Sequence, residues 1–254
     1  MKKLFTLLFT LSVLYSSTAQ EQLLRFGFYK VKPGMKADYE TTMIELMGPM
    51  MKERVKNGCM RNWIFREVLP GSEARNYFTH MTVDVLNLDS DNYNCPSVSA
   101  DKVFPEMSED MIKIIHKIRT SSRDVVYRTV VRKVAGYNKG DDVVKFAAFN
   151  FIKTKPGKKQ DYIKRNKEFT HENLKKYSNQ QAWYAWERYD AMAGGLLSWD
   201  YLSLDGYSKI ADKLNRVVNV PQSITNKENK IYGPLREMRD LNYQVLTRLL
   251  YAAD

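Results

Sequence analysis

The stretch KVKPGMKADY, from Lys30 to Tyr39, occurs a second time as KTKPGKKQDY, from Lys153 to Tyr162. In both places Pro-Gly follows a run rich in β-branched and aromatic residues, which is typical of a strand that ends in a turn. A motif that recurs at this distance indicates one structural unit present twice along the chain. The duplication therefore determines the architecture that we expect.

A second pattern closes each copy. Two arginines, an aspartate and a tyrosine recur at the same internal spacing. They are Arg123, Asp124, Tyr127 and Arg132 in the first copy, and Arg239, Asp240, Tyr243 and Arg248 in the second. We therefore expect a first unit over residues 20–135, a second unit over 143–254, and a linker between them over 135–142.

Each unit predicts the same order of elements. The first has strands over 25–32, 62–69, 76–86 and 125–134, with helices over 36–57 and 106–119. The second has strands over 145–153, 182–189, 197–204 and 242–251, with helices over 158–177 and 207–214. The order β-α-β-β-α-β is the ferredoxin-like arrangement, with an antiparallel sheet covered on one side by two helices. The predicted fold class is therefore α+β, in two tandem ferredoxin-like units.

With this element order, this Lys-Pro-Gly opening and this tandem copy, the chain resembles the dimeric α/β-barrel superfamily. That group includes antibiotic-biosynthesis monooxygenases, NIPSNAP-like and EthD-like proteins. The resemblance implies that the sheets of two units meet face to face and close a barrel, here within one chain, and that a ligand lies between sheet and helices. It implies no single activity, because members include oxygenases, haem proteins and proteins without known activity.

The N-terminus reads as a signal peptide over residues 1–19. Lys2 and Lys3 precede an apolar run from Leu4 to Leu14, and Ser17-Thr18-Ala19 resembles a cleavage site. The run is shorter than the about 20 residues that span a bilayer, and no later segment predicts a membrane span. We expect an exported protein, periplasmic or extracellular, that begins near Gln20.

The composition sets further limits. The 254 residues carry a formal net charge of +11, and the basic residues are spread along the chain. No nucleic-acid motif, phosphate-binding glycine loop or hydrolase triad is visible, so a nucleic-acid partner is not expected. Two cysteines and three histidines are too few for a zinc cluster, and no metal site is expected. Cys59 and Cys95 occur only in the first copy, and the sequence leaves open whether they form a disulfide.

We expect no cofactor, and disfavour haem. A haem-binding member of the superfamily would need an axial histidine, and His80 is the best placed because it lies in the middle of a predicted strand. Its counterpart in the second copy is Tyr201. The resemblance also points to Asn150, because haem-degrading members use an asparagine on the first strand together with a tryptophan and a histidine. The second copy has no histidine where that pattern requires one.

Two tryptophan–glutamate pairs repeat between the copies, Trp63 with Glu67 and Trp183 with Glu187. Residues four apart on a strand share one face, so each pair could line a pocket with the carboxylate as a base. The structural alternative, which we favour, is that each glutamate pairs with an arginine. The candidates are Arg66, Arg128 or Arg132 for the first copy, and Arg188 or Arg248 for the second.

The second copy is the better candidate pocket, because it is rich in aromatic residues, namely Trp183, Tyr184, Trp186, Trp199 and Tyr201. The sequence thus predicts an exported protein that binds a small, partly apolar ligand in an α/β-barrel pocket. Two alternatives are a cofactor-free monooxygenase-like enzyme and a structural or interaction module of the cell envelope. A homodimer of the whole chain is a further option.

Overall fold

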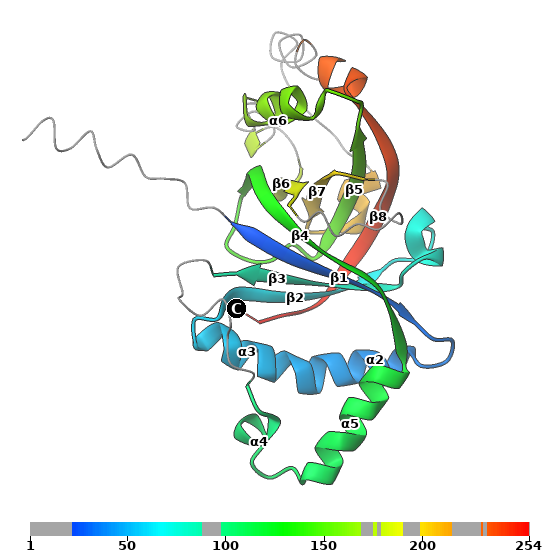
Figure 1. Cartoon of the computed structure of the whole chain (residues 1–254), viewed down its shortest axis with the longest axis vertical. Coiled ribbons are helices and arrows are strands. Elements are labelled where there is room, and N and C mark those ends of the chain that lie inside the picture. Colours follow the sequence, from blue (N-terminus) through cyan, green and yellow to red (C-terminus); the bar gives the residue numbers. More distant parts are fainter. Residues whose placement is uncertain are drawn as a thin grey trace, which may run out of the picture.

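The computed structural model describes residues 22–87, 98–168, 175–176, 179–189, 199–214, 230 and 233–253, with the side chains of 167 and 168 excepted. Eight antiparallel strands close into one barrel, and helices cover it from outside (Figure 1). The strands are β1 Leu23–Val31, β2 Met60–Val68, β3 His80–Leu86, β4 Arg123–Asn138, β5 Phe146–Thr154, β6 Ala182–Arg188, β7 Tyr201–Tyr207 and β8 Arg239–Ala252.

The strand order around the barrel is β1-β3-β2-β8-β5-β7-β6-β4. Each unit therefore contributes a sheet of the same internal order, β4-β1-β3-β2 from the first and β8-β5-β7-β6 from the second. The units meet at two seams, β2 against β8 and β4 against β6. Exchanging the units maps one seam onto the other, as in a symmetric dimer. The predicted fold is confirmed, with both sheets closing one barrel in a single chain.

The helices of the first unit are α2 Lys36–Thr41, a π-helical turn η1 Thr42–Met47, α3 Gly48–Lys56, a short 3₁₀ helix η2 Glu73–Asn76, α4 Ala100–Val103 and α5 Glu109–Ser121. Those of the second are α6 Lys159–Glu168 and α8 Ile210–Leu214. Figure 1 shows α2, α3 and α5 on one side of the barrel and α6 on the opposite side. No helix within the described ranges is long and apolar enough to cross a membrane.

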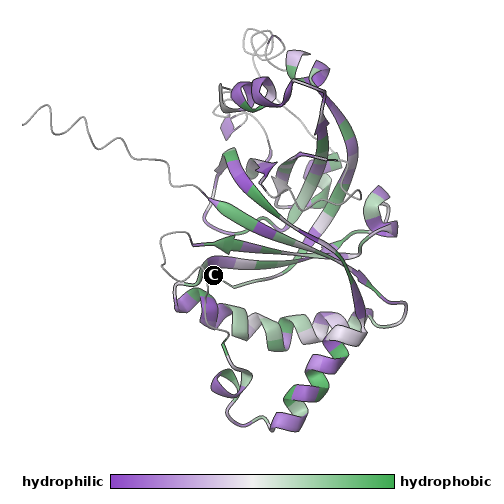
Figure 2. Cartoon of the chain, viewed as in Figure 1, coloured by the Kyte–Doolittle hydropathy of each residue, from purple (hydrophilic) through white to green (hydrophobic). Residues whose placement is uncertain are grey.

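The predicted helix over 36–57 is present, but a π-helical turn divides it. Pro49 lies in the first turn of α3 and has no backbone N–H to donate. A proline at this position removes one helical hydrogen bond, and it lies where η1 joins α3. The α5 helix begins after Ser108, whose hydroxyl accepts a hydrogen bond from the Met111 amide. Figure 2 shows hydrophobic and hydrophilic residues alternating along α5.

Several strand boundaries differ from expectation. The strand expected over 197–204 is β7 Tyr201–Tyr207, and the one expected over 242–251 is β8 Arg239–Ala252. The boundaries of β4 and β3 differ as well. β4 runs on to Asn138 and so includes the first four residues of the expected linker, because Val131 to Asn138 pair with β6 of the other unit. β3 begins only at His80, because the preceding residues 73–76 form η2. Both differences come from tertiary pairing, which a local pattern does not contain.

Three clusters form the core. Side chains of both units line the barrel interior, with Phe26 and Phe28 from β1 facing Phe149 and Phe151 from β5. A second cluster lies between the outer face of the first sheet and helices α2 to α5, and a third lies under α6. Because alternate strand residues point to opposite faces, each strand serves the interior and a helix layer at once. The barrel thus offers three places for a site, one inside and one under each helix layer.

Candidate functional site

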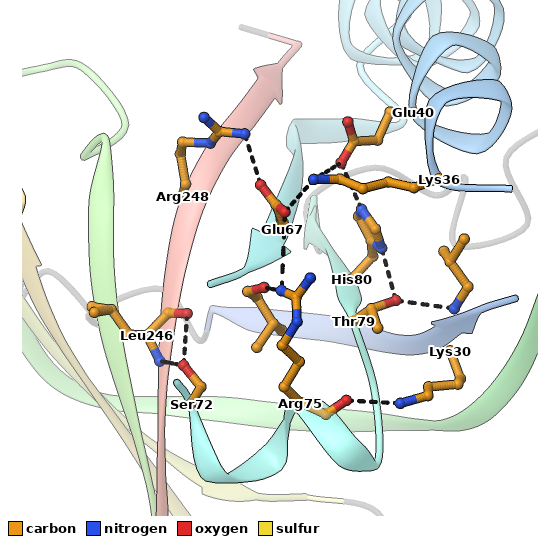
Figure 3. Close-up of polar contacts among 12 residues, drawn as sticks. Lys30, Lys36, Glu40, Glu67, Ser72, Arg75, Thr79, His80, Leu246 and Arg248 are labelled. Atoms are coloured by element: carbon orange, nitrogen blue, oxygen red, sulfur yellow. Dashed lines mark hydrogen bonds and ion pairs between the residues drawn. The ribbon is translucent and has the colours of Figure 1, made fainter. Parts of the chain in front are cut away.

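The two repeated glutamates lie at the seams. Glu67 is buried on β2, where Lys36 Nζ donates to its Oε1 at 2.6 Å and Arg248 Nη2 to its Oε2 at 2.7 Å (Figure 3). Glu187 on β6 accepts from Arg132 Nε at 2.7 Å and also from Arg132 Nη2. Each glutamate therefore pairs with the repeated arginine of the other unit. The favoured pairing of each glutamate with an arginine is present. In each pair, however, the arginine belongs to the other copy, whereas the candidates lay in the same copy as the glutamate.

The charges around Glu67 favour the ionised form of its carboxyl group. Burial by itself would raise the pKa of the carboxyl, but the hydrogen bonds and charges of Lys36 and Arg248 outweigh burial and lower the pKa. Arg75 Nη1 also lies 4.0 Å from Glu67 Oε1, so three cations surround an ionised carboxylate at the seam. As a general base it would be weak, because the bound cations compete with a proton.

His80 is 1% exposed, and both of its ring nitrogens contact protein groups. Nε2 lies 2.9 Å from Glu40 Oε1, and Nδ1 lies 2.9 Å from Thr79 Oγ1 (Figure 3). The ring stacks on Phe65 at 5.5 Å between centroids. With both nitrogens engaged, His80 does not offer a free nitrogen as a ligand in this arrangement. His171 lies outside the described residues.

The aromatic residues expected to form one pocket in the second unit lie on two faces. Trp186 and Trp199 belong to the barrel interior, with Tyr184 packed against them. Trp183 and Tyr201 belong to the cluster under α6. The expectation of a single aromatic pocket there is not met, because neighbouring strand residues point to opposite sides of the sheet.

Asn150 lies on the helix-facing side of β5, inside a polar network. Its Nδ2 donates to Ser203 Oγ and to Asp205 Oδ2, each at 3.2 Å. Gln244 Nε2 donates to Asn150 Oδ1 at 2.5 Å, and Gln180 Nε2 donates to Asp205 Oδ1 at 2.8 Å. These side chains satisfy one another, so the second unit fills this place with its own polar groups.

At the corresponding place in the first unit there is a cavity of about 330 Å³. It lies between the outer face of β1 and β3 and the helical segment η1–α3. Its cationic lining consists of Arg25, Arg54, Arg119, Arg123 and Arg128. The opposing wall is apolar and consists of Met43, Met47, Met51 and Trp63. We call it the arginine cavity. Of the eight residues predicted from sequence, Trp63 alone lines it.

The arginine cavity holds more positive than negative charge. Among the described residues, Asp84 is the one carboxylate of the lining, and Arg25 already binds it through Nε at 2.7 Å and Nη2 at 2.5 Å. The Nε atoms of Arg54 and Arg119 are buried and have no hydrogen-bond partner among the residues that the structure describes. Buried donors without partners are costly, and native proteins retain them chiefly at functional sites.

The arginines perturb one another and Tyr29. Burial, followed by repulsion from Arg123, lowers the pKa of Arg119. The Arg123 guanidinium lies 3.9 Å from the centre of the Tyr29 ring. Burial would raise the pKa of the Tyr29 phenol, but the hydrogen bond to Thr82 and the charges of Arg123 and Arg128 outweigh it and lower the pKa. The lowered pKa of Tyr29 is the shift expected where neighbouring arginines stabilise a negative charge.

Gly27 keeps the arginine cavity open. A Cβ atom at this position would lie 2.4 Å from the Tyr29 hydroxyl and 2.9 Å from Thr82 Oγ1. The matching residue of the second unit is Asn150, and the counterpart of Arg128 is Gln244. The signal that sequence reasoning missed is this pair of differences between otherwise matching copies. From the sequence the basic residues are spread along the chain, and Arg128 is only a candidate partner of the first-copy glutamate.

Cys59 is disulfide-bonded. Cys95 lies outside the described residues.

Comparison with solved structures identifies the fold. A candidate monooxygenase from Fusobacterium nucleatum has a TM-score of 0.54 at 11% identity, covering 91% of this chain and 93% of that one. A candidate monooxygenase from Lactobacillus acidophilus has a TM-score of 0.54 at 8% identity, covering 92% and 96%. An anthrone oxidase-like protein has a TM-score of 0.50 at 9% identity, covering 92% of each chain. The chain therefore has the dimeric α/β-barrel fold. No protein-family model matches the sequence, and no curated protein does.

The expectation of no cofactor, with haem disfavoured, is corrected by these comparisons. The similar structures also include a haem-binding protein from Thermus thermophilus and chlorite dismutase from Candidatus Nitrospira defluvii, at TM-scores of 0.42 and 0.48. Proteins that bind haem thus occur among structures of similar shape, and the absence of a cofactor is not retained as a conclusion. The described residues contain no cluster of three or more metal-ligating side chains.

Proposed function

We propose that the protein binds a small anion with an aromatic or apolar body in the arginine cavity of its first unit. The observation that carries the proposal is the lining of five arginines against one carboxylate that is already paired. Arg54 and Arg119 each present a buried N–H that an anionic oxygen could accept. The methionines and Trp63 opposite them suit an apolar body, since thioethers adapt to its shape.

Salicylate is a suitable probe, with the uncharged salicylamide as a matched ligand. Calorimetric titration should show one salicylate site per chain and markedly weaker binding of salicylamide. The Arg128→Gln variant carries the residue that the second copy has at this place, so it tests the charge at little steric cost. Losing one hydrogen bond to a charged group costs about 1.5–3 kcal/mol, so affinity should fall roughly tenfold or more.

The matched control is Arg61→Gln, because Arg61 is an exposed arginine of the same unit outside the cavity lining. This variant should bind salicylate as the unchanged protein does. Equal binding by the Arg128 and Arg61 variants, or equal affinity for salicylate and salicylamide, would contradict the proposal.

A second candidate function is catalysis in the same cavity, favoured by Tyr29 alone. Its phenol lies in the cavity and has a lowered pKa, so it could exchange a proton with a bound anion near neutral pH more readily than an ordinary tyrosine. Protein purified from its own cells can be denatured, and any small molecule that this releases can be incubated with unchanged protein and with Tyr29→Phe and followed by mass spectrometry. An enzyme is supported if the molecule is converted by unchanged protein but only bound by Tyr29→Phe. If neither protein alters the molecule, the protein is a binding protein and not an enzyme for it.

Export is a separate proposal that rests on the sequence, because residues 1–21 lie outside the described part of the chain. A basic start, a short apolar run and a small-residue site support it. The mass of the protein isolated from its own cells tests it. A chain that begins near Gln20 is expected, and one that still carries Met1 to Ala19 would refute cleavage.

A further inference from the structure

We propose that the barrel interior is a second binding site, which takes a fatty acid of medium length or a similar monoanion with one apolar chain. The site differs from the arginine cavity, which lies on the opposite face of the same sheet. Three features carry the inference, namely an apolar cavity in the interior, one buried cation with no carboxylate partner among the described residues, and two polar atoms of the cavity lining that have no partner there either.

The cavity has a volume of about 270 Å³. Its walls are inward-facing side chains of both units, and they include Leu24, Ile64, Val83, Phe149 and Leu204. At one end of the barrel lies the connection from β4 to β5, with residues 141–144 in the lining. Small-molecule sites are typically apolar cavities of this order with a few polar groups that fix orientation.

The buried cation is Arg66, which is 2% exposed and points inward from β2. Its Nε donates to Thr247 Oγ1 at 2.9 Å, and its Nη2 donates to the carbonyl oxygens of Val144 at 2.9 Å and Lys145 at 3.2 Å. No carboxylate lies within ion-pair distance of Arg66 among the described residues. Burial lowers the pKa of Arg66 to about 9, with no neighbouring anion to oppose the shift. The positive charge of Arg66 is therefore stabilised by neutral oxygens among the described residues.

Two further polar atoms of the lining have no partner in the described structure, Asn62 Oδ1 and Trp186 Nε1. Trp186 is the counterpart of Arg66 in the other unit, so equivalent positions of the duplicated unit present a cation on one side of the barrel and an indole on the other. Buried polar atoms are normally paired with protein or with something bound. The lining thus offers an indole N–H at Trp186 in addition to the guanidinium of Arg66.

The charges around the cavity also limit the ligand. Asp141 and Asp142 line it beside Lys133, so the lining contains as many acidic as basic side chains. Such a site repels a polyanion, whereas a single carboxylate can reach Arg66. The apolar walls then take up the chain, since each buried methylene contributes about 0.8 kcal/mol. These features together favour a monoanionic amphiphile.

Decanoate is the probe, with decanol as the uncharged control. Binding can be followed by calorimetry and by the change in intrinsic tryptophan fluorescence, to which Trp186 in the cavity wall contributes. Arg66→Met removes the charge and keeps the length of the side chain, and it should weaken decanoate binding about tenfold while changing decanol binding little. Val85→Phe narrows the lining at a half-buried position and should weaken both ligands. If a melting curve shows that Arg66→Met does not fold, the decanoate affinity of Val85→Phe becomes the deciding measurement.

Arg128→Gln separates the two sites. It should weaken salicylate and leave decanoate unchanged, so failure of the arginine cavity and failure of the barrel site give different results. The barrel proposal is overturned if decanoate does not bind, if its affinity is the same in Arg66→Met and Val85→Phe as in unchanged protein, or if Arg128→Gln alone abolishes its binding.

Discussion

At the scale of single residues, the difference between the two units comes down to a few exchanges. Gly27 stands where the second unit has Asn150, and Arg128 where it has Gln244. In the second unit the amides bond to each other and to Asp205. In the first, a missing side chain leaves space and an arginine supplies charge. The same backbone thus gives a filled polar network in one half and an anion-favouring cavity in the other.

Tyr29 predicts how the arginine cavity responds to pH. Its folded-state pKa is lowered, so the phenolate forms below its ordinary value of 10.0 and neutralises part of the cationic field. Salicylate affinity should therefore be highest near neutral pH and fall as pH rises through the lowered pKa of Tyr29. In Tyr29→Phe this decline should move to higher pH. Calorimetric titrations over a pH series give the comparison, and identical profiles for the two proteins would contradict the assignment.

At the scale of elements, the two seams depend on the same ion pair used twice. Arg248 on β8 meets Glu67 on β2, and Arg132 on β4 meets Glu187 on β6. Each unit gives a glutamate to one seam and an arginine to the other, which explains why both residues are repeated in the two copies. A residue that serves a two-fold contact must occur in each half.

Glu67→Gln should destabilise the protein by about 1–2 kcal/mol, because it removes a charge-assisted seam while Lys36 and Arg248 can still reach water. The pKa of Glu67 is lowered on folding, so its stabilisation is present above its ordinary value of 4.5 and is lost as pH falls through the folded-state value. The variant should therefore lose less stability on acidification than unchanged protein. Denaturant unfolding at several pH values measures this.

Glu106→Gln is the control, because Glu106 is exposed and stands apart from both seams. It should follow unchanged protein at every pH. Equal acid sensitivity of the Glu67 variant and this control would show that the seam carboxylate does not contribute.

The sequence predicted the elements better than the site. Strand and helix periodicity and the repeated Lys-Pro-Gly turn were enough for the ferredoxin-like order, because these are local patterns. Glu67 and Arg248 are far apart along the chain, and only closure of the barrel brings them together. The five arginines come from two strands and two helices, so no window of sequence contains the cavity. Comparing the copies position by position would have shown Gly27 and Arg128 as departures.

At the scale of the whole molecule, the chain has the architecture of a dimer whose two halves are joined by a short connection. The barrel closes only when both sheets are present, because β2 and β4 of the first unit pair with β8 and β6 of the second. An isolated unit would expose two sheet edges and the interior faces of its strands, which are aggregation-prone features.

Cutting the connection should therefore leave the barrel assembled. Residues 140–142 are exposed, and a protease site inserted there should be cleavable in the folded protein. The two halves should remain together at micromolar concentration in size-exclusion chromatography, held by both seams and the shared core. Glu67→Gln combined with Glu187→Gln should weaken this association. Halves that separate on cleavage without any such change would show that the seams are weak.

The central claim is that the first unit binds an anion because its cavity departs from the filled network of the second. Gly27→Asn tests it most directly, because it gives β1 the residue of β5 and pushes an asparagine against Tyr29 and Thr82. Salicylate titration of this variant, with a melting curve to confirm folding, should show loss of the site in a folded protein. Undiminished salicylate binding by folded Gly27→Asn would contradict the account.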